Sequence, residues 1–286
     1  MTGDLAARIE RALGAPPASL PRRIGGGATG SVFAFETAQG ARLAVKQAAA
    51  REAQLDLEGW MLRLLAERSA LPVPAVHYAA PELLIMDFVE TGGPIDARAE
   101  EHAADLIAAL HGVRGEVFGL ERDTLIGPLI QPNRPRARWL DFYAEERLLP
   151  FARAALDAGG IGAQTMDRAE RLAGRIGDFL AEPDHPSLIH GDLWGGNVLA
   201  RAGRIAGFID PAVHYAHPEV ELAFTTLFGT FGERFFARYQ ERRPIEPGFF
   251  KERRDLYLMY PLLVHATLFG AGYGRQADAI LRRAVG

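Results

Sequence analysis

Short apolar runs separated by turn residues fill the first 90 residues of the chain, a pattern typical of β-strands. Glycines and prolines mark most of the turns between these runs. A long helix is expected over residues 48–69, because Leu55, Leu62 and Leu65 recur at helical spacing. The expected strands are residues 21–25, 31–37, 41–47, 75–78 and 83–89.

Helical periodicity replaces the strand pattern after the turn-forming residues 91–94. The expected helices, including a short one near the N-terminus, are residues 4–13, 97–111, 137–149, 151–158, 166–181, 218–228, 233–241, 250–269 and 276–284. We therefore expect an α+β fold with two lobes. Residues 1–90 would form a small lobe with a five-stranded antiparallel sheet and one long helix, and residues 91–286 a larger, mainly helical lobe.

Composition narrows the classes of partner. The net charge is −4 and the sequence pI is about 6.1, whereas a nucleic-acid-binding protein carries a basic surface. We therefore expect no nucleic acid partner, and a cationic substrate is compatible with this charge. The chain has no cysteine, which excludes disulfides, thiol catalysis and zinc–thiolate sites. Residues 1–13 have no apolar core and charges interrupt the long apolar runs, so we expect a cytoplasmic protein with no membrane partner.

Residues 190–197 form the most informative motif of the chain, with the sequence HGDLWGGN between two apolar pairs. Asp192 precedes Asn197 by the spacing of the kinase catalytic loop H-R-D-L-x-x-x-N, with Gly191 in place of arginine. In that loop the aspartate receives the proton of the attacking hydroxyl, and the asparagine binds Mg²⁺. An aspartate that only closes a tight turn would leave Asn197 unexplained. We therefore expect Asp192 to be the catalytic base and Asn197 a metal ligand, with His190 bracing the loop.

Asp210 is the second expected metal ligand. It follows the apolar run 205–209, and carboxylate and amide oxygens are ligands that Mg²⁺ prefers. The position corresponds to the aspartate of the kinase D-F-G motif, but Pro211 and Ala212 follow it, so we expect no flip of this segment. A cap of a helix or turn is the alternative role for this aspartate.

Residues 25–32 fit the kinase glycine-rich loop G-x-G-x-x-G-x-V with the sequence GGGATGSV. Gly25, Gly27 and Gly30 would let backbone N–H groups approach the phosphates of ATP. The motif alone is weak, because a flexible hairpin turn has the same composition. Its position between two expected strands argues against a dinucleotide site, which lies between a strand and a helix.

Lys46 ends the apolar run 43–45, as the lysine of the kinase V-A-I-K strand does, and is expected to bind the α- and β-phosphates of ATP. A lysine on the solvent face of an edge strand is the alternative. A lysine that must hold one position needs a carboxylate partner. We select Glu58 over Glu52 and Glu67, because Glu58 shares a helix face with the leucines of residues 48–69.

The junction between the expected lobes contains Met86, Asp87, Phe88 and Val89, and we expect this hinge to contact the adenine through its backbone. Taken together, the motifs occur in the order of a bilobal protein-kinase-like fold. The aromatic-rich residues 224–273 are expected to pack mostly in the protein core.

The loop of residues 190–197, followed by IDPAV at residues 209–213, resembles the fructosamine kinase (ketosamine-3-kinase) family, which has an aminoglycoside-phosphotransferase-like fold. The sequences LFG at residues 227–229 and LFGAGY at residues 268–273 support the resemblance. Its specific element is Asp-Leu-Trp in the loop, because aminoglycoside and choline kinases of the same fold usually lack that tryptophan. The resemblance extends from the glycine-rich loop to Tyr273.

This resemblance implies an ATP- and Mg²⁺-dependent kinase that phosphorylates the 3-hydroxyl of a ketosamine, a ketose joined to an amine. The phosphorylated adduct then decomposes, so the implied activity is protein deglycation, with a small-molecule or protein-bound ketosamine as substrate. The implied roles are ATP positioning for Lys46 and Glu58, base catalysis for Asp192, Mg²⁺ binding for Asn197 and Asp210, and sugar contact for Trp194. We expect a monomer or a weak homodimer.

The chain departs from the family pattern at Pro218, Glu221 and Val264, where arginine, aspartate and asparagine are usual. We expect Glu219 and Glu221 to pair with the substrate amine, with an acidic helix N-terminus as the alternative. The departures leave two other functions open. One is a small-molecule kinase of the aminoglycoside or choline kinase type, and the other is a catalytically silent nucleotide-binding protein.

Overall fold

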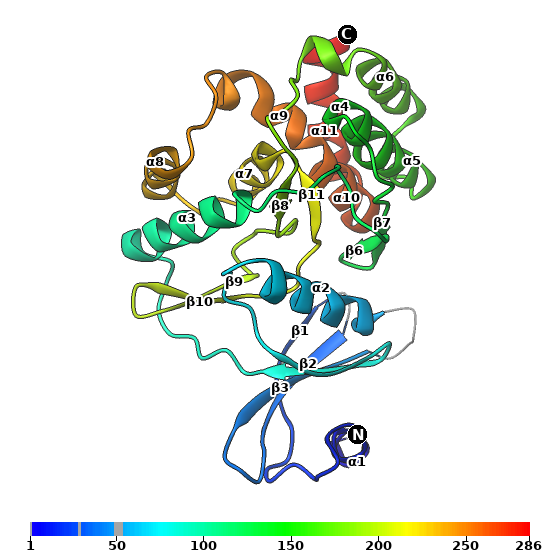
Figure 1. Cartoon of the computed structure of the whole chain (residues 1–286). Helices are drawn as coiled ribbons and strands as arrows, with labels where there is room; N and C mark the ends of the chain where they lie inside the picture. The colour runs from blue at the N-terminus through cyan, green and yellow to red at the C-terminus, as the bar shows by residue number, and fades with distance from the viewer. Residues whose placement is uncertain (1, 28–29, 49–53) are drawn as a thin grey trace. The chain divides into compact units, whose positions relative to one another are not determined.

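The computed structural model of the chain describes residues 2–27, 30–48 and 54–286 (Figure 1). Its residues group into two compact units. The first contains the chain up to Ala99 together with Asn197–Pro211, and the second contains Glu100–Gly196 and Ala212–Gly286. This grouping assigns residues 197–211 to the N-terminal unit, which the division expected at residue 90 did not include. That division stays a prediction.

The first unit contains the five-stranded antiparallel sheet that the short apolar runs predicted. The strand order is β1-β2-β3-β5-β4, so β3 lies in the middle. The strands are β1 (Arg22–Gly27), β2 (Gly30–Glu36), β3 (Arg42–Gln47), β4 (Val76–Ala80) and β5 (Leu83–Asp87). A hairpin therefore joins the two strands that flank the glycine-rich motif, as expected from the sequence, although Ala28 and Thr29 lie outside the described residues.

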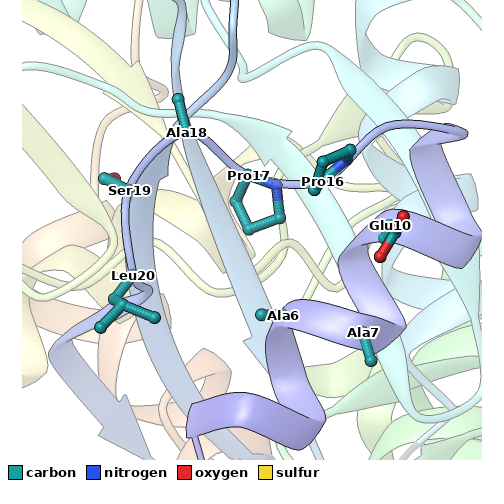
Figure 2. A pocket seen from close by; sticks show the side chains of 8 residues that line it. All are labelled: Ala6, Ala7, Glu10, Pro16, Pro17, Ala18, Ser19 and Leu20. Carbon is teal, nitrogen blue, oxygen red and sulfur yellow. The ribbon is translucent and has the colours of Figure 1, made fainter.

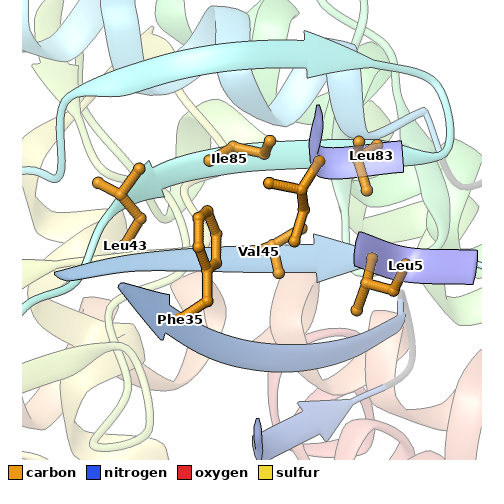
Figure 3. Close-up of a cluster of buried hydrophobic side chains, with 7 residues drawn as sticks. Leu5, Phe35, Leu43, Val45, Leu83 and Ile85 are labelled. Atoms are coloured by element: carbon orange, nitrogen blue, oxygen red, sulfur yellow. The ribbon is translucent and has the colours of Figure 1, made fainter. Parts of the chain in front are cut away.

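Each face of this sheet has its own hydrophobic core. On one face, Leu43 and Val45 of β3 pack with Leu5 and Ile9 of helix α1 (Thr2–Leu13), as Figure 3 shows in part. On the other face, Ala44 packs with leucines of α2 (Leu55–Arg68). Side chains alternate along a strand, so Lys46 shares the α2 face with Ala44.

The long helix begins later than predicted. Its first residue is Leu55, and Gln54 before it adopts a left-handed conformation with φ of 51°, which does not continue a helix. Residues 49–53 of the expected helix, including the rival Glu52, lie outside the described residues. The first unit also contains a hairpin of β9 (Val198–Arg201) and β10 (Arg204–Phe208).

The second unit is mainly helical, which together with the sheet of the first unit confirms the predicted α+β class. Its α-helices are α3 (Ala97–His111, starting in the first unit), α4 (Trp139–Phe142), α5 (Leu149–Asp157), α6 (Ala163–Gly174), α7 (Pro218–Leu227), α8 (Glu233–Arg242), α9 (Arg254–Tyr257), α10 (Met259–Phe269) and α11 (Ala271–Val285). The short elements are the π-helical turns η2 (Tyr143–Leu148) and η4 (Phe249–Arg253), the 3₁₀ turn η3 (Ile176–Asp178), the hairpin β6 (Thr124–Ile126) with β7 (Leu129–Gln131), and the pair β8 (Ser187–Ile189) with β11 (His214–Ala216).

Some predicted helix ends were wrong. The break expected near Pro150 is absent, because α4, η2 and α5 follow one another directly and Pro150 lies in the first turn of α5. A proline is tolerated there, since its missing N–H would have no partner within that helix. No helix among the described residues has both the length and the apolar character needed to cross a membrane.

A shallow hollow of the first unit lies between α1 and the segment that follows it (Figure 2). Its lining is mostly apolar and contains none of the residues expected to act on a substrate. The lining residues are Ala6, Ala7, Glu10, Pro16, Pro17, Ala18, Ser19 and Leu20.

Candidate active site

The ammonium of Lys46 lies between two carboxylates in the first unit. Its Nζ is 2.7 Å from Oε2 of Glu58 on α2 and 3.0 Å from Oδ1 of Asp210, which follows β10. Lys46 is only 3% exposed, whereas the side chain of Asp210 is 41% exposed. The structure thus brings together three of the residues selected from the sequence, and Asp210 is the open side of the group.

The charges of this group hold the lysine in its protonated form. Burial alone would lower the pKa of Lys46, but the negative charges of Glu58 and Asp210 outweigh burial and raise it. Burial and the charge of Asp210 raise the pKa of Glu58, and the ammonium of Lys46 opposes that rise by stabilising the carboxylate. Oε1 of Glu58 is buried without a hydrogen-bond partner among the described residues, so this carboxylate depends on Lys46.

Asn197 and Asp210 are held together through the backbone. Nδ2 of Asn197 donates a hydrogen bond of 3.4 Å to the carbonyl oxygen of Asp210, and the N–H of Ile209 donates to the carbonyl of Asn197 at 3.1 Å. Asp210 has a φ of 51°, a left-handed conformation that aspartate tolerates better than most residues. Their amide and carboxylate oxygens are the hard donors that suit Mg²⁺.

The loop that carries Asp192 leaves β8 through a tight turn at Gly191. Gly191 has a φ of 88°, and a Cβ added there would lie 2.1 Å from the carbonyl oxygen of Ala212. This explains why the arginine of the kinase motif is replaced by glycine in this chain. His190 is buried and braces the turn, since its carbonyl accepts from the N–H of Ala212 at 2.8 Å and its Nδ1 accepts from the N–H of Asp192 at 3.3 Å.

Glu221 on α7 holds the same turn from the interior. Its Oε1 accepts from the N–H of Gly191 at 2.7 Å, and its Oε2 accepts from the N–H of His190 at 3.3 Å. Nε2 of His111 lies 2.9 Å from Oε2 of Glu221, and Nδ1 of His111 lies 2.7 Å from the hydroxyl of Tyr239. We call Glu221, His111 and Tyr239 the loop-support network.

Burial and hydrogen bonding determine which groups of the loop-support network carry protons. Burial lowers the pKa of His111, so the ring is neutral, and its Nε2–H donates to Glu221 while Nδ1 accepts from Tyr239. Burial alone would raise the pKa of Glu221, but hydrogen bonds from His111 and Gly191 lower it. Glu221 is therefore an anion that holds two backbone N–H groups just before Asp192.

The expectation that Glu219 and Glu221 contact the substrate amine needs correction. Both side chains are buried, and each has protein partners. Glu219 forms a bidentate ion pair with Arg253, with N···O distances of 2.8 and 2.7 Å. Their contacts give Glu221 a role in supporting the loop and Glu219 a role in anchoring η4 to α7.

Trp194 lies on the surface of the second unit, 41% exposed, two residues after Asp192. Its ring packs edge-on against Phe228 with a centroid distance of 6.2 Å. A Cβ on Gly196 would lie 2.4 Å from the indole, so a glycine is needed there for this position of the ring.

The expected nucleotide-binding segments have the following places. In the glycine-rich motif, Gly25 pairs with Val32 and Gly27 with Gly30 at the end of the β1–β2 hairpin. At the expected hinge, the N–H of Asp87 donates to the carbonyl oxygen of Ala75, and the N–H of Phe88 donates to the carbonyl oxygen of Arg42. Contact of the adenine with Met86, Asp87, Phe88 and Val89 stays a prediction. Because the N–H groups of Asp87 and Phe88 already have acceptors, such contacts would use mainly other backbone groups of this segment.

Sequence reasoning missed His111 and Tyr239. The available signal was a polar side chain on an apolar helix stripe, because His111 follows Ala104 and Ile107 at helical spacing. Such a position indicates a buried histidine but does not identify its partner. Tyr239 gave no signal that distinguishes it from a core aromatic residue.

Comparison with known proteins identifies a matching family model and related sequences. All residues 1–286 match the family model described as fructosamine kinase. A probable ketoamine kinase of Synechocystis is 36% identical over 220 residues, which cover 74% of this chain and 72% of that protein. A chloroplastic protein-ribulosamine 3-kinase of Arabidopsis thaliana is 31% identical over 268 residues, which cover 90% of this chain and 80% of that protein.

A solved structure gives the same result. The crystal structure of a Thermobifida fusca protein, described as a fructosamine-3-kinase, has a TM-score of 0.89 and 33% identity. The match covers 100% of this chain and 99% of that one. The fold described above is therefore found in an experimental structure of a related sequence.

Proposed function

This chain belongs to the fructosamine kinase family, and from that membership we propose that it is an ATP-dependent kinase of ketosamines. The acceptor in this proposal is the 3-hydroxyl of a ketose joined to an amine, such as a ribulosamine or fructosamine. The observation that carries the proposal is the ammonium of Lys46 between Glu58 and Asp210, at the distances given above. In protein kinases the ion pair of such a lysine with a helix glutamate must be in place for the lysine to hold the phosphates of ATP.

Lys46 acts on the nucleotide side of the reaction. Its ion pair with Glu58 fixes the ammonium in a buried position, so little side-chain freedom is left to lose when phosphate binds. Asp210 is its more exposed partner, which makes this side of the ammonium the one that phosphate oxygens would approach. Gly25, Gly27 and Gly30 would supply backbone N–H groups to the same phosphates.

Asp192 is the proposed base. A sugar hydroxyl is too weak an acid to ionise beforehand, so the carboxylate orients it and accepts its proton as the bond to phosphorus forms. The loop-support network and the turn at Gly191 fix the backbone beside Asp192 before the substrate binds. Trp194 would then contact the apolar face of the ketose.

Asn197 and Asp210 fit Mg²⁺. Because Nδ2 of Asn197 is directed to the carbonyl of Asp210, its Oδ1 is the end of the amide that can accept a ligand. With the carboxylate of Asp210 this makes two hard oxygen donors, and Mg²⁺ commonly takes one or two protein ligands together with phosphates and waters. When bound, the ion supplies neutralisation of charge on the transferred phosphoryl group.

Phosphorylation at the 3-hydroxyl would place a good leaving group beside the ketose carbonyl. Loss of a C1 proton followed by expulsion of phosphate would convert the adduct to a conjugated imine, and water would hydrolyse this imine to the free amine and a 3-deoxy dicarbonyl sugar. We therefore propose protein deglycation as the outcome. Both free and protein-bound ketosamines fit this chemistry.

The test supplies ATP and Mg²⁺ and measures the formation of ADP with each of four acceptors. These are ribulosyl-lysine and fructosyl-lysine, with kanamycin and choline for comparison. We expect turnover of the two ketosamines. Asp192→Asn should lower kcat by about 10²–10⁴-fold with an unchanged unfolding midpoint. Asp178→Asn, a change at an exposed ion pair with Arg175, serves as the matched control and should leave kcat unchanged. Turnover of kanamycin or choline alone would overturn the proposal.

A further inference from the structure

Aromatic side chains continue from Trp194 along the surface of the second unit. Phe228, which contacts Trp194, packs against His265 at a centroid distance of 5.1 Å. His265 packs in turn against Phe269 at 5.5 Å and Tyr273 at 5.0 Å. We call Phe228, His265, Phe269 and Tyr273 the aromatic ridge. Together with Trp194, which lies two residues after the proposed base in the sequence, the ridge forms a continuous row of rings.

Two rings of this row are exposed, whereas most aromatic residues of the stretch 224–273 are buried, as expected. Phe269 is 64% exposed and Phe228 is 41% exposed, while Phe235 and Tyr257 in the same stretch are buried. A single exposed phenylalanine needs no explanation, but two exposed phenylalanines that are linked through His265 and continue from Trp194 form a patch of the kind that binds ligands.

His265 contributes a neutral ring to the ridge. Its Nδ1 lies 2.7 Å from the carbonyl oxygen of Pro261, which can only accept, so Nδ1 carries the proton and Nε2 carries the lone pair. Burial lowers the pKa of His265, which keeps the ring neutral at pH 7. The negative faces of such rings attract a cation, and their carbon surface also packs against methylene groups.

We propose that the aromatic ridge binds the amine-bearing part of the ketosamine, namely the secondary ammonium and the aliphatic chain of a glycated lysyl residue. This inference rests on the proposed function, because it places the sugar at Asp192 and Trp194 and lets the amine extend along the ridge. A lysyl side chain combines one cation with four methylene groups, which is the chemistry that this row of rings can recognise. The ridge therefore discriminates between ketosamines by their amine part and not by their sugar.

The test compares two substrates that share a sugar but differ in the amine: the ribulosamine of Nα-acetyl-lysine amide and the ribulosamine of methylamine. Phe269→Ala should raise KM for the lysyl substrate by about two- to fivefold, the effect of about one buried methylene group, because the far end of the ridge packs against the aliphatic chain that only this substrate carries. KM for the methylamine substrate and for ATP should stay within the error of the wild-type values. Phe269→Trp should retain tight binding of the lysyl substrate.

A matched control is Phe250→Ala. Phe250 is 48% exposed in the second unit, but it packs against Phe236 and Phe249 and is not part of the ridge. This variant should behave as wild type with both substrates, and thermal unfolding will report any loss of folding in either variant.

The outcomes separate the ridge from the proposed function. If wild type phosphorylates both ribulosamines and Phe269→Ala changes their KM values equally or not at all, the ridge assignment is wrong and the proposed function stands. If wild type phosphorylates neither, both fall. A concentration-dependent dimer that Phe269→Ala dissociates, with no change in KM, would make the ridge an interface between two copies and overturn the assignment.

Discussion

Lys46 owes its role to one property of a strand, the alternation of its side chains. Val45 enters the core beneath α1, so Lys46 must project to the face covered by α2, where Glu58 lies. A shift of one residue in β3 would separate the pair. The ammonium is thus held by the same register that builds the sheet.

Replacement of Lys46 by methionine should therefore affect both binding and folding. We expect Lys46→Met to raise KM for ATP by about 10- to 100-fold, since a charge-assisted hydrogen bond contributes about 1.5–3 kcal/mol. The free energy of unfolding should fall by about 3–5 kcal/mol, because the carboxylate of Glu58 is left buried without its partner. Steady-state kinetics and urea unfolding measure the two effects.

The double variant Lys46→Met/Glu58→Gln distinguishes these effects, because it removes the buried charge as well. It should regain part of the lost stability without regaining ATP binding. Lys251→Met, at an exposed position of η4, is the control. A wild-type KM for ATP in Lys46→Met would contradict the role of this residue.

The loop that carries Asp192 is supported by three helices that are distant in sequence. Glu221 comes from α7, His111 from the end of α3 and Tyr239 from α8, and together they hold the N–H groups of His190 and Gly191. Each link is buried, so each unpaired group would remain out of reach of water.

Tyr239→Phe tests this arrangement with the smallest change. It leaves Nδ1 of His111 without its donor, which should lower the free energy of unfolding by about 1–3 kcal/mol. We expect kcat to fall and KM for ATP to stay unchanged, because the network acts on the loop of Asp192. An equal change of kcat and of KM for ATP would show that the tyrosine only supports the fold.

At the scale of the whole molecule, His111, His214 and His217 make the free energy of unfolding dependent on pH. Burial lowers the pKa of His111, of His214 and of His217, the last to about 3 with the charges of Arg253 and Arg243 contributing. Below pH 6.5 the unfolded chain takes up protons that the folded chain cannot, so these groups favour folding at neutral pH and this contribution is lost as the pH falls.

Urea unfolding at pH 7.5, 6.5 and 5.5 should show this loss, up to about 1.4 kcal/mol per pH unit for each histidine. His111→Gln should reduce the slope by about one such contribution. A free energy of unfolding that does not change between pH 7.5 and 5.5 would contradict this account.

Lysine is scarce in the whole chain. Of the 32 lysine and arginine residues, only Lys46 and Lys251 are lysines. Lys46 is 3% exposed, and its ion pairs outweigh burial and raise its pKa, so it presents almost no reactive neutral amine. The folded protein therefore offers one exposed lysine side chain, Lys251, to a reducing sugar.

Incubation of the folded protein with ribose, without ATP, should give lysine adducts at Lys251 and not at Lys46. Peptide mass spectrometry measures both positions, and the same reaction in denaturant is the control in which both lysines should react. Modification of Lys46 in the folded protein would show that its ion pairs do not protect it.

Local pattern was sufficient for much of the fold. Short apolar runs between turn residues predicted the five strands. Helical spacing predicted most of the helices, because burial of one face imposes a period on the sequence. The start of α2 at Leu55 was not predicted, since nothing in residues 48–54 breaks the helical composition. Motif spacing selected Lys46, Glu58 and Asp210, which the structure brings together.

The spacing of residues in the sequence could not show whether the acidic side chains after Asp210 are buried or exposed. From the sequence, Glu219 and Glu221 have the charge and the position expected of residues that bind a substrate amine. In the structure both lie on α7 with buried side chains. Their partners lie about 30 residues or more away along the chain, at Arg253 and at Gly191. Local sequence carries the period of an element and the chemistry of its side chains, whereas long-range packing decides which of those side chains meets water and which meets another part of the chain.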